Sequence, residues 1–123
     1  MEEKEINAED FMKMFVAISY ASEQVYFNFV DLTGYIFGRY TIDGDVYNEF
    51  EDVLDSMISD ETVTKVEGCN NLYQVNRKFD YINTIKDNRD YLEDMVRLFK
   101  CFYDKSNRKL NIRLVSKTNE FSK

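Results

Sequence analysis

Residues 43–61 carry eight carboxylates and no basic residue. Four of these carboxylates recur at intervals that place them along the solvent side of one helix: Asp45, Glu49, Asp52 and Asp55. Carboxylates at this spacing can meet the Lys and Arg side chains with which a partner would otherwise neutralise phosphates. A solvated face that binds nothing is the alternative interpretation. A calcium loop is not indicated, because Asp43-Gly44-Asp45 lacks alternating oxygen ligands and a glycine at the sixth position.

Basic residues gather instead in the last third of the chain. The members that could contact phosphates from one strand are Arg108, Lys109, Arg113 and Lys117. Tyr73, Phe79 and Tyr103 could then serve as stacking platforms for bases. The alternative is that these cations offset the acidic half, within one molecule or across a dimer.

Aromatic residues are concentrated between residues 15 and 40, where eight rings occur. Most of them are expected in the core. Residues 25–30, however, are apolar on nearly every side, which is more than one face of a small domain can bury. The surplus predicts a contact surface formed by Tyr26, Phe27 and Tyr35, since such rings are enriched at interfaces. A homodimer would cover it most simply.

The chain lacks the residues that most catalytic and metal-binding sites use. The chain has no histidine, so it lacks the commonest general base and the usual partner of a serine or cysteine nucleophile. Cys69 and Cys101 stand alone, without zinc-site spacing, and no glycine-rich phosphate loop is present. We therefore expect no enzyme activity, no metal and no cofactor.

Charge divides the chain into two halves. Residues 1–61 carry 15 acidic and three basic residues, and residues 62–123 carry eight acidic and 13 basic residues, for a net charge of −7. Such a division indicates binding rather than catalysis. The acidic first residues do not resemble a signal peptide, and no uncharged stretch is long enough to cross a membrane. These features predict a cytoplasmic protein with reduced thiols.

Apolar spacing predicts helices at residues 8–22, 45–59 and 87–104, the first of them capped by Asn7. Residues 25–42 admit two interpretations. Their spacing favours a helix that continues to Thr33 and ends at Gly34, whereas their β-branched and aromatic density favours strands at 25–30 and 35–42. We expect the helix.

Alternating patterns predict strands at residues 62–67, 72–79 and 109–117, with a hairpin-like loop at residues 68–71. The simplest organisation is a single α+β domain over residues 1–123. Two or three helices would pack with a small antiparallel sheet, and residues 1–6 and 118–123 would fray.

Together these features predict a small acidic interaction protein that binds a partner with a basic surface and inhibits or regulates it. Residue types with AT-rich codons are abundant, which indicates a low-GC bacterium, its phage or a mobile element. A phage or mobile-element inhibitor of a host nucleic-acid-binding defence enzyme fits this description. Two alternatives stay open, namely a nucleic-acid-binding regulator that uses the C-terminal basic strand and a dimeric secretion-type chaperone. No membrane partner is expected.

Overall fold

The structure, a computed structural model, describes residues 4–76, 82–108, 110 and 112–116. Its helices are α1 (Ala8–Ala21), α2 (Phe29–Phe37), α3 (Val46–Ser59), α4 (Ile82–Asp87), the 3₁₀ helix η1 (Arg89–Tyr91) and α5 (Leu92–Tyr103). Its strands are β1 (Lys4–Asn7), β2 (Tyr26–Asn28), β3 (Thr41–Asp43), β4 (Val63–Lys65), β5 (Leu72–Val75) and β6 (Ile112–Val115). The mixed α+β class is confirmed, but the described residues hold more helices and strands than we expected.

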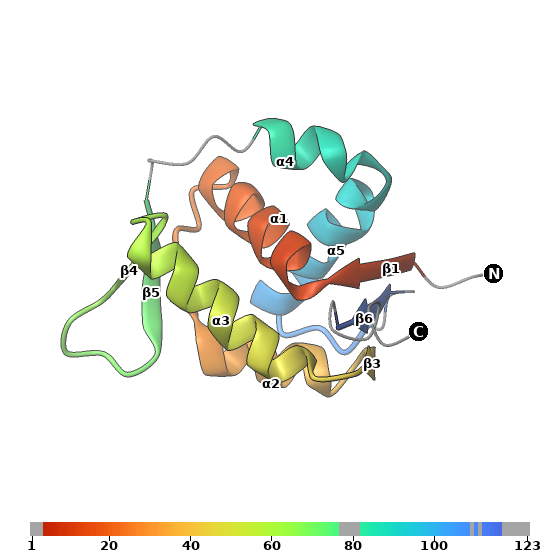
Figure 1. Ribbon diagram of the computed structural model, residues 1–123, viewed down its shortest axis with the longest axis horizontal. Coiled ribbons are helices and arrows are strands. Elements are labelled where there is room, and N and C mark those ends of the chain that lie inside the picture. Colours follow the sequence, from red (N-terminus) through yellow and green to blue (C-terminus); the bar gives the residue numbers. More distant parts are fainter. Residues whose placement is uncertain (1–3, 77–81, 109, 111, 117–123) are drawn as a thin grey trace.

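Helix α1 is the centre of the molecule and is buried on nearly every side. It begins as predicted, because Asn7 Oδ1 accepts a hydrogen bond of 2.9 Å from the backbone N–H of Asp10. Helices α3, α4 and α5 pack around it, together with β5 (Figure 1). From Phe11 to Ser19 every residue except Lys13 is buried, and a helix that is apolar on most sides has to be enclosed by other elements, so the sequence of α1 accounts for its central place.

Aromatic rings join α1 to its neighbours. The fully buried ring of Phe15 lies 5.6 Å, centroid to centroid, from both Phe27 of β2 and Phe99 of α5. The ring of Phe11 meets Phe50 of α3 edge-on at 5.5 Å. Edge-on and tilted contacts are favourable arrangements for aromatic pairs, so these rings fix how α3, α5 and β2 sit against α1.

Within the described residues the strands form two three-stranded sheets rather than the single antiparallel sheet that we expected. In one sheet β6 lies between β1 and β3 and is parallel to both, with Leu114 opposite Ile6 and Ile42. In the other sheet β5 lies between β2 and β4 and is antiparallel to both. Alternation predicts a strand but not its neighbours. Parallel partners come from distant parts of a chain, because a parallel pair needs a long crossover.

Residues 25–42 match neither interpretation of their sequence. The chain forms the short strand β2, then turns directly into α2, and later forms β3. Phe27 lies opposite Tyr73 of β5, with the two rings stacked at 5.8 Å, and this pairing keeps the segment extended. Asn28 ends the strand and starts the helix, because its Oδ1 accepts a hydrogen bond of 3.0 Å from the N–H of Asp31.

The remaining elements agree with their predicted ranges to different degrees. Helix α3 starts one residue later than predicted and ends where predicted. Among the described residues, strands β4, β5 and β6 are shorter than the predicted 62–67, 72–79 and 109–117, and residues 77–79, 109, 111 and 117 of these ranges lie outside the described residues. The predicted helix 87–104 is divided, since α5 begins only at Leu92, after α4 and η1. We expected residues 1–6 and 118–123 to fray; Lys4–Asn7 form β1, and residues 1–3 and 118–123 lie outside the described residues.

Candidate functional site

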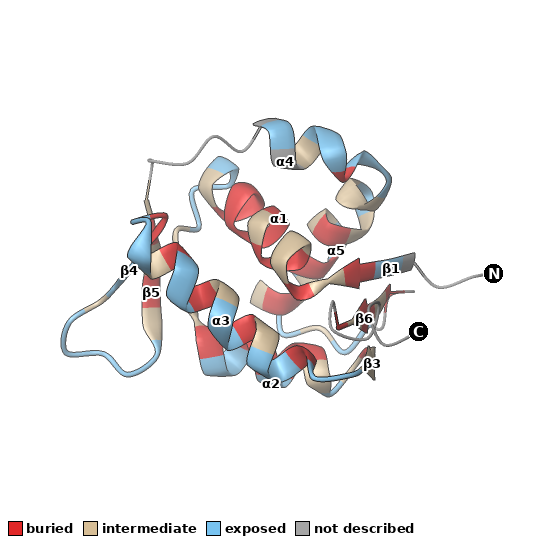
Figure 2. Cartoon of the chain, in the orientation of Figure 1, coloured by how far each residue is buried: buried red, intermediate tan, exposed pale blue. Residues whose placement is uncertain are grey.

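Helix α3 is amphipathic, as its sequence predicts. It buries an apolar stripe that packs on α1 and β4 and consists of Val46, Phe50, Leu54 and Met57. In Figure 2 exposed residues recur along α3 between the buried ones. The side opposite the apolar stripe presents the predicted acidic face: Asp45, Asp52 and Asp55 are exposed, and Glu49 is half-buried. Because the apolar stripe anchors α3, these carboxylates project from a fixed element rather than from a loop.

A groove runs between α1 and the acidic face of α3. Its volume is about 320 Å³, and its lining residues are Glu9, Lys13, Asp52, Val53, Ser56, Met57 and Asp60. Val53 is half-buried and Met57 is buried, so they form an apolar floor. Three of the lining residues are acidic and one is basic, so the rim is anionic overall.

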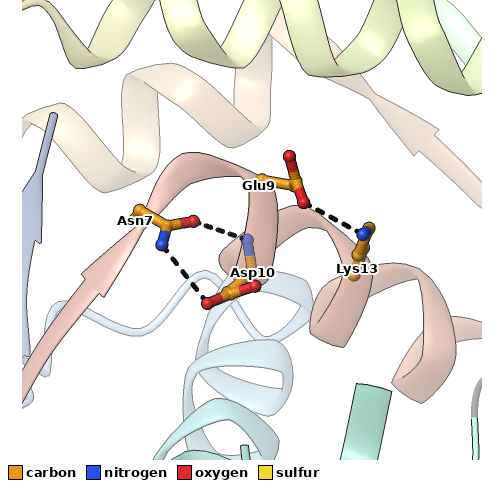
Figure 3. Close-up of polar contacts among 4 residues, drawn as sticks. All are labelled: Asn7, Glu9, Asp10 and Lys13. Carbon is orange, nitrogen blue, oxygen red and sulfur yellow. Dashed lines mark hydrogen bonds and ion pairs between the residues drawn. The ribbon is translucent and has the colours of Figure 1, made fainter. Parts of the chain in front are cut away.

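Three of the charged residues that line the groove already have partners. Lys13 Nζ lies 3.0 Å from Glu9 Oε2, and this pair occupies successive turns of α1 (Figure 3). Asp60 Oδ1 accepts hydrogen bonds from Thr62, at 3.0 Å from its backbone N–H and at 2.6 Å from its hydroxyl. These two bonds orient the Asp60 carboxylate at the end of α3. Asp52 makes no hydrogen bond or ion pair to the part of the chain that the structure describes.

The groove was missed at the sequence level except for Asp52. The spacing of Glu9 and Lys13 indicates an i,i+4 ion pair on one helix, and that signal is visible in the sequence. The approach of α1 to α3 is a tertiary contact, which no local pattern reports.

Two of the three rings that were predicted to form an aromatic contact surface are buried. Phe27 is 2% exposed and Tyr35 is 8% exposed, so both rings belong to the core, and of the three only Tyr26 reaches solvent, at 51%. Successive side chains of a strand point to opposite faces, which separates Tyr26 from Phe27. The ring of Tyr35 packs edge-on against Phe102 of α5 at 5.6 Å.

The basic residues proposed as an alternative site do not form one surface among the described residues. Arg108 is exposed. Arg113 on β6 is paired with Asp43 of β3, with its Nε 2.6 Å from Oδ2 and its Nη2 in contact with the same oxygen. Lys109 and Lys117 lie outside the described residues. The guanidinium of Arg113 is therefore engaged within the sheet.

A polar cluster that the sequence did not indicate lies at the end of α2. The guanidinium of Arg39 lies 4.1 Å from the centroid of the Tyr35 ring and donates a hydrogen bond of 2.8 Å to Asn107. Burial raises the pKa of the Tyr35 and Tyr40 phenols above their usual range. Burial also raises the pKa of Tyr103 to about 12. These phenols are protonated at neutral pH, and that of Tyr103 donates a hydrogen bond of 2.8 Å to the backbone carbonyl oxygen of Tyr26.

Within the described residues, no group of three His, Cys, Asp or Glu side chains is arranged to hold a metal ion. None of the helices described here is both long enough and apolar enough to cross a membrane. No protein-family model, no curated protein and no solved structure matches the chain.

Proposed function

We propose that this protein is a small acidic interaction protein that binds a basic surface on a macromolecular partner and thereby inhibits or regulates that partner. The observation that supports the proposal is the solvent side of α3, a rigid helix face with exposed carboxylates and no basic residue anywhere in residues 43–61. The contact residues on this face are Asp45, Glu49, Asp52 and Asp55.

Physical chemistry favours recognition by such a face. Like charges held along one helix create a local field that attracts a cationic partner and speeds its association. Charges at the rim of an interface mainly affect the association rate and its salt dependence. Because α3 is anchored by a buried stripe, little conformational entropy is lost when a partner binds.

The charge of α3 favours a protein partner over DNA. The exposed carboxylates of its face, Asp45, Asp52 and Asp55, would be repelled by the phosphates of a nucleic acid.

We also propose what class of protein the partner belongs to and in what kind of organism the two proteins meet. A ladder of carboxylates resembles the charge spacing of a nucleic-acid backbone, so it suits a protein that itself binds nucleic acid. The bias toward residues with AT-rich codons suits a phage or mobile element of a low-GC bacterium. We therefore propose a cytoplasmic inhibitor of a host nucleic-acid-binding defence enzyme, without catalytic activity of its own.

Charge reversal tests the proposal. The test variant replaces Glu49, Asp52 and Asp55 with lysines. The control variant makes the same replacements at three exposed acidic residues away from α3, which are Glu23, Glu67 and Asp104. Each protein is used to capture partners from a low-GC bacterial lysate, with and without nuclease, and the affinity of any captured protein is then measured at 50 and 300 mM salt.

We expect a nuclease-resistant protein partner whose affinity falls at least 100-fold with the test variant and less than threefold with the control variant. Equal losses with both variants would show that only net charge matters and would contradict the assignment to α3. Capture that disappears with nuclease would instead support nucleic-acid binding by the basic residues.

A further inference from the structure

We infer that the groove between α1 and α3 receives one arginine side chain from the partner. This inference rests on the proposed function and adds to it a specific contact, with a defined place and chemistry. The rest of the acidic face would contribute charge without a defined pocket.

The groove combines the two properties that an arginine side chain needs. Val53 and Met57 supply an apolar floor for the three-carbon stem. Asp52, Ser56 and Asp60 follow one another at single-turn intervals along the same side of α3 and supply acceptors for the head group. A neutral apolar ligand would leave these carboxylates desolvated, and a small ion would not use the floor.

The acceptors are partly organised before any ligand arrives. Both hydrogen bonds from Thr62 go to Oδ1 of Asp60, and among the described residues Oδ2 has no hydrogen-bond partner. The Asp52 carboxylate, about two turns away, is exposed and has no protein partner in the described part of the chain. A carboxylate fixed in this way loses little freedom when it accepts a hydrogen bond from a ligand.

The groove already accommodates one cation of its own. Lys13 holds its ammonium 3.0 Å from Glu9 at the α1 wall, which leaves the α3 wall as the anionic side. A second cation on that side would lie against Asp52 or Asp60, each one turn from Ser56, while Glu9 neutralises Lys13. The α1 wall therefore binds the cation of Lys13, and we expect the cation of the partner to bind at the α3 wall.

Size and geometry favour arginine over larger ligands and over lysine. A volume of about 320 Å³ is at the small end for ligand sites, enough for a long side chain but not for a helix or a nucleotide. The planar guanidinium presents five donors and is weakly hydrated, so it can bond to a carboxylate and to the Ser56 hydroxyl together. An ammonium is more strongly hydrated and offers a point charge instead.

The test is an NMR titration of the full-length, isotope-labelled protein at 150 mM salt. The probes are N-acetyl-arginine methylamide, the lysine analogue, and the citrulline analogue, which keeps the shape without the charge. Asp52→Asn removes one groove carboxylate. Asp55→Asn is the matched control, because Asp55 is exposed on the same helix but does not line the groove.

We expect the arginine probe to shift resonances of Asp52, Ser56 and Asp60 and of the first turns of α1. Asp52→Asn should weaken its binding at least fivefold and Asp55→Asn less than twofold, and citrulline should not bind. Equal effects of the two substitutions, or equal binding of citrulline, would overturn the groove assignment. The charge-reversal comparison with the partner is independent of this result, so the acidic interaction face could be upheld while the groove is rejected.

Discussion

Replacing Tyr103 with phenylalanine should reverse the order of stability between the two proteins as the pH rises. Tyr103 is half-buried, and its hydroxyl donates a hydrogen bond of 2.8 Å to the backbone carbonyl oxygen of Tyr26. This bond ties the end of α5 to β2. At neutral pH the Tyr103→Phe variant loses it, and we expect the free energy of unfolding to fall by about 1 kcal/mol.

The sign changes at alkaline pH because burial raises the pKa of Tyr103 from 10.0 to about 12. Between these values the unfolded chain releases the phenolic proton while the folded chain keeps it. The contribution of Tyr103 is therefore complete below pH 10 and is lost as the pH rises toward 12, at about 1.4 kcal/mol per pH unit. The loss at pH 11 is about 1.4 kcal/mol, so the two stability curves should cross near that pH.

The assay is equilibrium unfolding in guanidinium chloride with a thiol reductant, followed by circular dichroism at pH 7, 9, 10 and 11. Burial raises the pKa of Tyr35 and Tyr40 as well, but both proteins contain these residues, so their effects cancel in the difference. A stability difference that stays constant from pH 7 to pH 11 would refute the reasoning, because it would mean that Tyr103 titrates alike in the folded and unfolded chains.

Two further substitutions test the origin of the fold by the same unfolding measurement at pH 7. Asn28→Ala should cost about 1 kcal/mol, because α2 loses the cap on the N–H of Asp31, whereas Asn28→Asp should restore most of it. No loss with alanine would mean that the cap is dispensable. Phe15→Ala should lower the free energy of unfolding by about 4 kcal/mol, because it opens a cavity among the core rings. Tyr47 is 45% exposed, so Tyr47→Ala should lower it by less than about 1 kcal/mol. Similar losses at the two sites would contradict the central place of α1.

The sequence predicts those elements whose apolar residues recur over several helical turns. Helices α1 and α3 are recovered almost to the residue, because a long amphipathic or buried pattern has only one compact interpretation. Short strands are harder to predict, since β2 and β3 hold three residues each and depend on partners distant in the chain. Val63 and Val75, for example, are opposite one another only because β4 and β5 pair.

The candidate site also has one part that the sequence predicts and other parts that it does not. The acidic face follows from periodicity alone, because core residues on one side of α3 require polar residues on the other. The predicted exposure of Phe27 and Tyr35 is wrong for a physical reason. A count of apolar residues in a segment does not reveal that β2 turns Phe27 inward, or that α5 lies over Tyr35. The groove could not be predicted, since it exists only where two helices meet.

The fold also explains why the two oppositely charged halves of the sequence do not simply neutralise each other. Strand β6, from the basic half, inserts between β1 and β3 of the acidic half, and there Arg113 meets Asp43. Helix α3 lies outside that sheet and packs mainly on α1 and β4, whose lysines are Lys13, paired with Glu9, and the exposed Lys65. More carboxylates than these two cations can offset therefore remain on α3. Charge that contributes little to folding and is held on a rigid face is available for recognition, which is why α3 rather than the basic strand is the stronger candidate for partner binding.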